Sequence, residues 1–293
     1  MVYRIIENKV IDKAFSFYNI DEKYKEKCYK CAEEININES FYNSFNKVYE
    51  MLYLNDFSEI KALWNVKNVN ELFIVNINPF ATNLMIILGY EFHKNNMEKY
   101  DFDEIQINIH KKRVKECFEN DLIYRQYDGV RISQMLWATY FIRAKIIEIG
   151  LLQYEYENTE NNISTIKIHI PKGNKLDLGQ VKESIEKSKI ELRNIFNLRE
   201  LKYICNSWLL SNQIYNLIDK NSNIALFHKL FDVKDGDNCI DDILNFVYEV
   251  NKCDNYRKLP EKTSLQKTLK DELINNKKFY LGLGTLKENK KTK

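Results

Sequence analysis

Apolar spacing in this sequence changes near residue 130, and this change constrains the fold more than any other feature. Before the turn-like segment Arg125–Arg131, apolar residues recur mainly at the three- and four-residue spacing of helices. Two later segments, "LLQYEYE" from Leu151 and "IKIHIP" from Ile166, alternate apolar and polar residues as strands do. We therefore predict an α+β protein with two domains: a mainly helical N-terminal domain over residues 1–128, and a mixed β-sheet flanked by helices over residues 129–293.

The second region is predicted to open with a helix and to continue with strands. Ser133–Gly150 has an amphipathic helical pattern, and Gly150 stands where a helix commonly ends. The residues expected on its inner face are Leu136, Tyr140, Ala144 and Ile147. The two alternating segments would form a hairpin, joined by a polar linker. A helix over residues 178–196 follows, with an expected inner side of Val181, Ile185, Ile190 and Phe196. Further strand patterns, "KYICNSW", "HKLFDV" and "FYLGLGTL", alternate with helical ones.

Charge is balanced along the chain, which argues against nucleic acid as a partner. The 44 Lys and Arg residues nearly cancel the 42 Asp and Glu residues, and acidic residues stand beside basic ones almost everywhere. Nucleic-acid binders usually gather their basic residues on one face. The lysine-rich tail Lys287–Lys293 fits a solvated terminus better than a binding arm.

The sequence predicts a cytoplasmic protein that does not enter a membrane. Charged residues interrupt the start of the chain, unlike a secretory signal. The longest apolar run, Leu84–Tyr90, is far shorter than the ~18 residues of a membrane span. The six cysteines are expected to be reduced thiols. Cys28 and Cys31 have a zinc-like spacing, but no second pair follows and the four histidines are scattered, so no metal site is predicted.

The stretch "IKIHIPKGNKLDLGQ" has two interpretations. An apolar strand runs into a turn with Gly173, and a helix is expected to begin near Gly179; such a turn can hold a phosphate against the helix amides. Lys172 and Lys175 would add positive charge. Asp177, however, is placed to cap the helix, and a carboxylate at that position repels phosphate. From spacing alone, an ordinary capped corner is favoured.

His169 lies in the same strand, on the side away from its isoleucines and alongside Lys167. If that side lines a cleft, the imidazole would suit a general base at neutral pH. A histidine that is only exposed or hydrogen-bonded is the more common case. The residues alone leave both interpretations open.

Six segments follow one another in a distinctive order: "LWATYFIRAKIIEIGLLQYEYE", "IKIHIPKGNKLD", "YICNSWLL", "NSNIALFHKLF", "LPEKTSLQKTL" and "FYLGLGTL". Together they resemble a family of bacterial acyltransferase-domain proteins that is common in Firmicutes. The resemblance spans roughly residues 130–287. It implies a helical N-terminal domain followed by a C-terminal domain similar to the GNAT N-acyltransferase fold.

The resemblance also implies roles for particular residues. "IKIHIP" would be the central strand before the acyl-CoA pyrophosphate loop, "KGNKLDLGQ" would be that loop, and "YICNSW" would be the strand beside it. His169 would be the general base and Tyr215 the general acid. The residues expected to contact the coenzyme A part of the donor are Lys172, Gly173, Gly179, Gln180, Asn206 and Ser207.

Two functions remain open at this point. The first is a GNAT-like N-acyltransferase that moves an acyl group from an acyl-CoA-type donor to an amine, with a small-molecule donor and acceptor as its partners. The second is a non-catalytic binding or scaffold protein that keeps the fold, because the usual Gln/Arg-x-x-Gly-x-Gly/Ala loop is absent. An open V between the "IKIHIP" and "YICNSW" strands would favour the enzyme, whereas aromatic side chains such as Trp208 filling that V would favour the scaffold. The acceptor, the acyl chain and the oligomeric state are not predicted.

Overall fold

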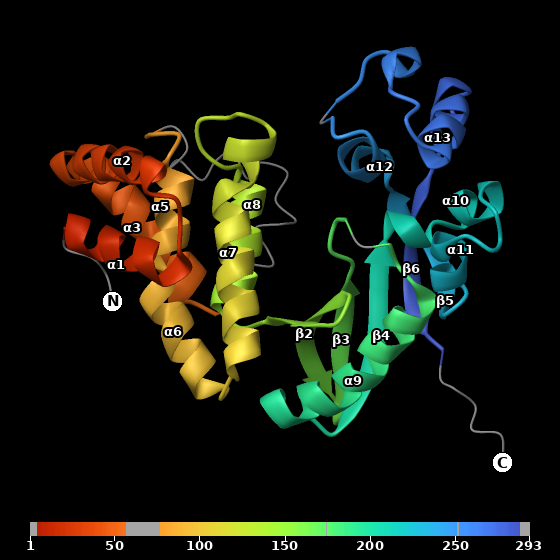
Figure 1. Ribbon diagram of the computed structural model, residues 1–293, viewed down its shortest axis with the longest axis horizontal. Helices are drawn as coiled ribbons and strands as arrows, with labels where there is room; N and C mark the ends of the chain where they lie inside the picture. Colours follow the sequence, from red (N-terminus) through yellow and green to blue (C-terminus); the bar gives the residue numbers. More distant parts are fainter. Residues whose placement is uncertain (1–4, 57–76, 174, 251, 288–293) are drawn as a thin grey trace. The chain divides into compact units, whose positions relative to one another are not determined.

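The computed structural model describes residues 5–56, 77–173, 175–250 and 252–287. The chain divides into two compact units, Met1–Ile147 and Glu148–Lys293 (Figure 1).

The described part of the first unit is built of helices around one central helix. They are α1 (Asn8–Tyr18), α2 (Lys25–Ile37), α3 (Glu39–Tyr53), α5 (Ala81–Leu88), α6 (Tyr90–Lys99), α7 (Glu104–Tyr124) and α8 (Ile132–Ile142). All eight residues of α5 are buried, and α5 contacts α1, α2, α7 and α8. Its sequence, "ATNLMIIL", is apolar over most of its circumference, as a helix enclosed by others requires. The prediction of a mainly helical N-terminal region is confirmed.

A six-stranded mixed sheet forms the core of the second unit, with the strand order β1-β2-β3-β4-β6-β5. β3 and β4 are parallel, whereas β2–β3, β4–β6 and β5–β6 are antiparallel. The predicted β2–β3 hairpin is confirmed, and it turns at Asn161 and Asn162, which both have positive φ. The strands are β1 (Ile146–Ile149), β2 (Leu152–Glu160), β3 (Ile163–His169), β4 (Glu200–Ser207), β5 (Phe231–Asn238) and β6 (Tyr280–Leu286).

The predicted helix over Ser133–Gly150 is wrong beyond its first part. After α8, Ala144 has a φ of 50°, which stops the helix, and β1 follows. Gly150, with φ 61°, lies in the turn between β1 and β2. The isoleucines of "IIEI" are β-branched and favour extended backbone. Their helical spacing is therefore a coincidence and does not indicate a helix.

α8 falls in the first unit, although the sequence analysis placed the domain boundary before it, between residues 128 and 129. Met135, Leu136 and Phe141 of α8 are buried in the apolar core that α1, α2, α3 and α5 share. Contact between α8 and this core therefore decides which unit the helix joins.

α9 (Leu178–Phe196) joins the two parallel strands and covers one face of the sheet (Figure 1). The Oγ of Ser184 lies 2.7 Å from the Tyr154 hydroxyl on β2, and the Oγ of Ser188 lies 3.0 Å from the Tyr203 hydroxyl on β4. The expected inner side of the helix was partly wrong, because Ile190 is 64% exposed while the two serines are buried. Hydroxyl pairs with strand tyrosines thus add to the apolar residues Val181, Ile185 and Leu192 that α9 also buries.

Further helices follow the later strands. They are the short helix η4 (Trp208–Leu210), α10 (Asn212–Leu217), α11 (Asn223–His228), α12 (Ile240–Val247), η5 (Tyr256–Lys258) and α13 (Ser264–Ile274). η4 packs on the α9 side of β6, where a Cβ on Gly282 would lie 2.1 Å from the Leu210 carbonyl oxygen. Gly282 is therefore required for the close approach of η4 to β6. α12 and α13 enclose a second, smaller core around Phe279.

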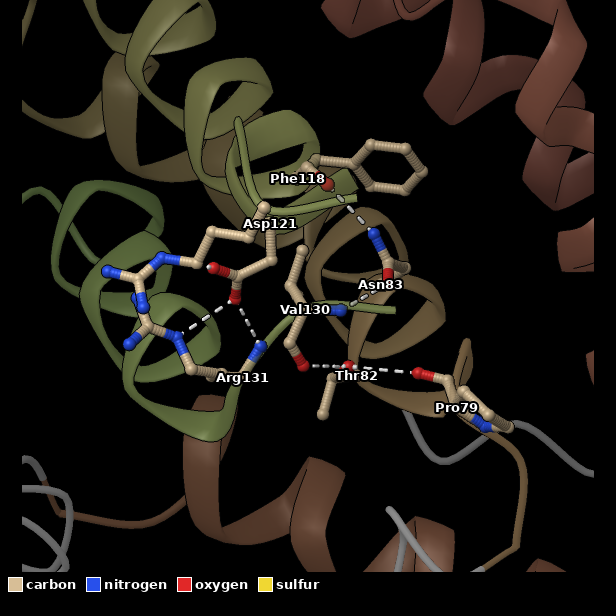
Figure 2. A network of polar contacts seen from close by, with 8 residues as sticks. Pro79, Thr82, Asn83, Phe118, Asp121, Val130 and Arg131 are labelled. Atoms are coloured by element: carbon tan, nitrogen blue, oxygen red, sulfur yellow. Dashed lines mark hydrogen bonds and ion pairs between the residues drawn. The ribbon is translucent and has the colours of Figure 1, made fainter. Parts of the chain in front are cut away.

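Figure 2 shows a polar network that holds the segment between α7 and α8. The Asn83 amide on α5 donates to the Phe118 carbonyl at 2.8 Å and accepts from the Val130 amide at 3.0 Å. Asp121, which is fully buried, accepts from the amide and the Nε of Arg131 at 2.8 and 3.1 Å. Because buried polar groups are costly unless hydrogen-bonded, this network specifies the path of the segment.

Replacing Asn83 tests this network. Asn83→Ala leaves two buried main-chain groups without their partner and opens a small cavity, so we expect the free energy of unfolding to fall by about 2–4 kcal/mol. Urea denaturation followed by circular dichroism measures the change. Asn95→Ala, at an exposed position on α6, is the matched control and should cost less than about 0.5 kcal/mol. Equal losses in the two variants would contradict the role of the network.

His93 and His110 form a buried pair in the first unit. The Tyr18 hydroxyl lies 3.1 Å from Nδ1 of His93, and Nε2 of His93 lies 3.3 Å from Nδ1 of His110. Burial, with smaller contributions from His110 and Lys111, places the pKa of His93 well below its ordinary value. His93 is therefore neutral in the folded protein at neutral pH.

Acid should destabilise the first unit through His93. Below about pH 6.5 the unfolded chain takes up a proton that the folded protein does not, so stability falls as the pH decreases. Between pH 7 and pH 5 this group accounts for a loss of up to about 2 kcal/mol. Denaturation at several pH values in wild type and His93→Gln measures it, since the variant should show a shallower pH dependence whatever its absolute stability. An unchanged pH dependence would disprove the assignment.

Candidate functional site

β3 and β4 part at their C-terminal ends. Their parallel pairing ends at Lys167 and Ile204. The last two residues of β3 continue to pair with β2, and the last three residues of β4 pair with β6. Within the described chain, no strand pairing joins these two strand ends to each other. The open V that the sequence analysis required of an enzyme is therefore present in the backbone.

Side chains at this V divide between the two faces of the sheet. Ile168 is opposite Tyr154 and is buried on the α9 side, so its neighbour His169 belongs to the other face. Asn206 follows the same rule on β4, because Cys205 is buried opposite Gly284. The face away from α9 therefore carries His169 of β3 and Asn206 of β4.

Cys205 is the thiol nearest to the parting on β4. Burial raises its pKa to about 12, against an opposing effect of the Lys167 charge. Because the thiolate is the nucleophilic form, Cys205 is not activated for nucleophilic attack at neutral pH.

His169 is paired with a carboxylate that the sequence analysis did not single out. Its Nε2 lies 2.8 Å from Oε2 of Glu155 on β2. Glu155 is only 2% exposed and Gln153, two residues before it, is 4% exposed. Alternation in this strand shows that Gln153 and Glu155 share a face, but it does not show whether that face is covered. The local sequence therefore did not indicate that Glu155 is buried.

The segment after β3 turns sharply before α9 begins. The Lys172 ammonium forms an ion pair with Glu249, just beyond α12, and both side chains are about two-thirds exposed. Gly173 has a φ of 94° and open space where a Cβ would lie. The Asn223 side-chain amide donates to the Lys175 carbonyl, which ties the turn to the start of α11. The turn thus presents two exposed lysines at the end of the parted strand.

α9 begins as predicted, with Asp177 as its N-cap. The Asp177 carboxylate accepts from the Gln180 amide at 3.0 Å, and the Val181 amide donates to the Asp177 carbonyl at 2.9 Å. Gly179 stands in the same first turn, where a Cβ would lie 3.2 Å from the Asp177 carboxylate. The capped corner is therefore confirmed as a structural feature, whatever else this turn binds.

Asn206 and Ser207 differ in what they offer to a ligand. The Ser207 hydroxyl oxygen accepts from the Leu209 amide at 3.2 Å and caps η4. Asn206 is exposed and lines a shallow depression of about 420 Å³ across β4, β6 and β5. The other side chains at this depression include Ile204, Leu283, Thr285, Asp232 and Lys234. It lies on the His169 face of the sheet.

Trp208 is the aromatic side chain that the sequence analysis named as an example of one that would fill the V in a scaffold protein. It packs against the smaller core that contains Ile214, Ile243 and Phe279. The aromatic ring therefore belongs to the α12–α13 region of the unit.

Tyr215 is held among residues of α10, α11 and the turn between them. Its ring stacks on the His228 ring, with centroids 4.2 Å apart, and the Lys220 ammonium lies 3.8 Å from the ring centroid. Burial and the nearby lysines lower the pKa of His228. None of these contacts involves His169, so the structure does not bring the two predicted catalytic residues together directly.

The described residues contain no cluster of three or more His, Cys, Asp or Glu side chains that could hold a metal ion. Cys28 and Cys31 are both buried on α2, and burial raises the pKa of Cys28 to about 12. In the described part of the chain, no helix combines the length and apolar character needed to span a membrane.

Comparison with known proteins identifies relatives of this architecture. Residues 146–286 match the family model of the GNAT-like C-terminal domain. An acyltransferase solved in complex with decanoyl-CoA is 15% identical, with a TM-score of 0.67, and the match covers 95% of this chain and 99% of that one. A mutant acyltransferase in complex with octanoyl-CoA is 14% identical, with a TM-score of 0.70, covering 97% and 90%. No curated protein sequence matches the chain.

A third solved structure holds an acyltransferase with decanoyl-CoA and teicoplanin; it is 15% identical, with a TM-score of 0.68, and the match covers 97% of this chain and 89% of that one. At these identities the likeness concerns the fold. The C-terminal unit has a GNAT-like fold. Each of these structural matches covers the helical first unit of this chain as well as the second unit that contains the sheet.

Removing the cap of α9 tests the local account of the turn. Asp177→Ala leaves the Gln180 amide without its carboxylate, so we expect the free energy of unfolding to fall by about 1 kcal/mol. Chemical denaturation measures the loss. Asp254→Ala, at an exposed position outside the helices and strands, is the matched control and should cost less than about 0.5 kcal/mol. If the two variants behaved alike, Asp177 would not be capping the helix in solution.

Proposed function

We propose that this protein is an N-acyltransferase that moves an acyl group from an acyl-CoA-type donor to an amine. The observation that carries the proposal is the parting of β3 and β4 beyond Lys167 and Ile204. Parallel strands that separate leave main-chain amides and carbonyls along both facing edges. The pantetheine arm of coenzyme A contains amide groups, and it can pair with such an edge as an added strand does.

The similar solved structures support a medium-chain donor. Two of those acyltransferases were solved with decanoyl-CoA and octanoyl-CoA, and each match covers at least 95% of this chain. One of the related proteins also holds teicoplanin. A medium-chain acyl-CoA is therefore the donor to test first here, whereas the amine acceptor is open.

The turn after β3 would bind the donor's pyrophosphate. Lys172 is exposed and Gly173 has open space beside it, so phosphate oxygens can approach the backbone there. Gly179 would contribute its main-chain amide at the start of α9. The Gln180 amide already donates to Asp177, so Gln180 would contribute its exposed side chain. The usual glycine-rich run is absent, and the two lysines of the turn supply charge in its place. Asn206 would border the pantetheine arm from β4.

His169 would act as the base in this reaction. The acceptor amine gives a proton to the imidazole as its nitrogen attacks the thioester carbonyl, and the C–S bond then breaks to release the thiolate. Tyr215 would protonate that thiolate, as the family resemblance implies. A thioester lying between the parted strands borders both faces of the sheet, so an acid from α10 and a base on the other face need not touch each other.

A non-catalytic scaffold is the alternative, and one contact favours it. Asp177 places a carboxylate where phosphate would meet the start of α9. The position of Trp208, which packs into the smaller core, removes the other argument for a filled V. Ligand titration separates the two functions.

Titration with octanoyl-CoA should raise the melting temperature of the purified protein. A ligand that binds only the folded state at 100 times its Kd adds about 2.7 kcal/mol of stability. Lys172→Glu and Lys175→Glu should each weaken binding by about tenfold or more, because each places a negative charge in the proposed phosphate turn. Both sites are exposed, so these variants should fold.

Lys278→Glu is the matched control, since it makes the same charge change at another exposed position of the second unit. It should leave octanoyl-CoA binding unchanged. No stabilisation of wild type at millimolar octanoyl-CoA would reject the proposal in favour of the scaffold. Release of free coenzyme A thiol from octanoyl-CoA, followed with a thiol reagent, then measures turnover.

A further inference from the structure

Glu155 is a buried carboxylate that contacts His169. A histidine can act as a base without a carboxylate partner, so the contact calls for a further explanation. Glu155 lies on β2, two residues along from Gln153, which is the residue directly opposite His169. Its Oε2 therefore reaches His169 Nε2 across the diagonal of the hairpin, at 2.8 Å. The contact is set by strand register, and a slip of one strand by one residue would place Glu155 and His169 on opposite faces of the sheet.

Keeping a carboxylate this deeply buried has a cost. A buried ionised group destabilises a fold by several kcal/mol unless paired and hydrogen-bonded. The register places Lys167 directly opposite Glu155, so a lysine is the neighbour across the strand pair. The carboxylate also contacts the His169 imidazole, at 2.8 Å from Nε2.

A carboxylate held against one ring nitrogen controls an imidazole in two ways. It fixes the plane of the ring, and it keeps a proton on the nitrogen that it contacts. With Nε2 donating to Glu155, a proton from an attacking nucleophile must arrive at Nδ1. The imidazolium formed then faces a negative charge that is already in place, which lowers the energy of the charged state without reorganisation.

We propose that Glu155 is a positioning residue that orients His169 and directs proton uptake to Nδ1. This inference rests on the acyl transfer proposed above. In that reaction the bond from the acceptor nitrogen to the acyl carbon forms, the C–S bond breaks with its electron pair going to sulfur, and the acceptor's proton moves to Nδ1. Glu155 remains ionised throughout and takes up no proton.

A double-mutant cycle tests the coupling between the two residues. The probe is octanoyl-CoA with water as acceptor, followed by release of coenzyme A thiol, so no acceptor amine need be identified. Glu155→Gln should lower kcat at least tenfold while the Kd for octanoyl-CoA changes less than twofold. In a His169→Gln background the same change should cost less than twofold, because Glu155 acts through the imidazole.

Glu160→Gln, at the exposed end of the same strand, is the control and should leave kcat unchanged. Equal losses from Glu155→Gln in both backgrounds, or no loss in wild type, would overturn the positioning role. A merely structural contact would lower the melting temperature without this dependence on His169.

Nuclear magnetic resonance keeps the inference testable if octanoyl-CoA is not turned over. With ¹⁵N-labelled histidine, His169 should show an observable proton on Nε2, assigned by its absence in His169→Gln. That signal should vanish in Glu155→Leu and persist in Glu160→Gln. Its persistence in Glu155→Leu would overturn the inference, whereas failure of octanoyl-CoA to bind or react would reject the proposed function alone.

Discussion

The parallel pairing of β3 with β4 is the constraint on which the candidate site depends. Parallel neighbours require a crossover, and α9 supplies it, so the turn into α9 must begin where β3 ends. The C-terminal end of β4 returns to that same edge of the sheet. The parted strands, the lysine-bearing turn and the capped start of α9 are therefore brought to one edge by chain topology alone.

Two buried carboxylates show how partners decide the role of a charge. Asp121 in the first unit is bound by the Arg131 guanidinium and main-chain amide, and a guanidinium stays charged at any ordinary pH. Such a pair can hold the α7–α8 segment but cannot exchange a proton. Glu155 instead contacts an imidazole at a parted strand end. Both carboxylates are buried, so the chemistry of their partners, and not burial, distinguishes the structural role of Asp121 from the positioning role that we propose for Glu155.

Local patterns predicted the elements whose signals are complete within a few residues. The helix over residues 178–196 has the predicted bounds, since an Asp177 cap and a regular apolar spacing mark it. The β2–β3 hairpin was equally readable from alternation. The end of α8 was not, because "KIIEIG" satisfies a helical spacing and only its pairing in the sheet makes it a strand.

The chemistry of the site was less predictable because it arises from contacts distant in sequence. His169 was recognisable as a candidate, yet its partner Glu155 comes from the preceding strand and is chosen by register. The point at which β3 and β4 part depends on where each strand changes its neighbour. No short motif encodes either feature, and Tyr215 likewise lies among contacts with His228 and Lys220 that no spacing indicated.

The most direct test of the account is hydrogen exchange at the parted strands with and without octanoyl-CoA. If the donor lies between β3 and β4, main-chain amides of residues 168–170, 172–173 and 205–207 should exchange more slowly when it is bound, by tenfold or more. The outer strands β1 and β5 serve as internal references and should change little. Slower exchange confined to other parts of the chain, with residues 168–170, 172–173 and 205–207 unchanged, would contradict the claim that this parting is the donor site.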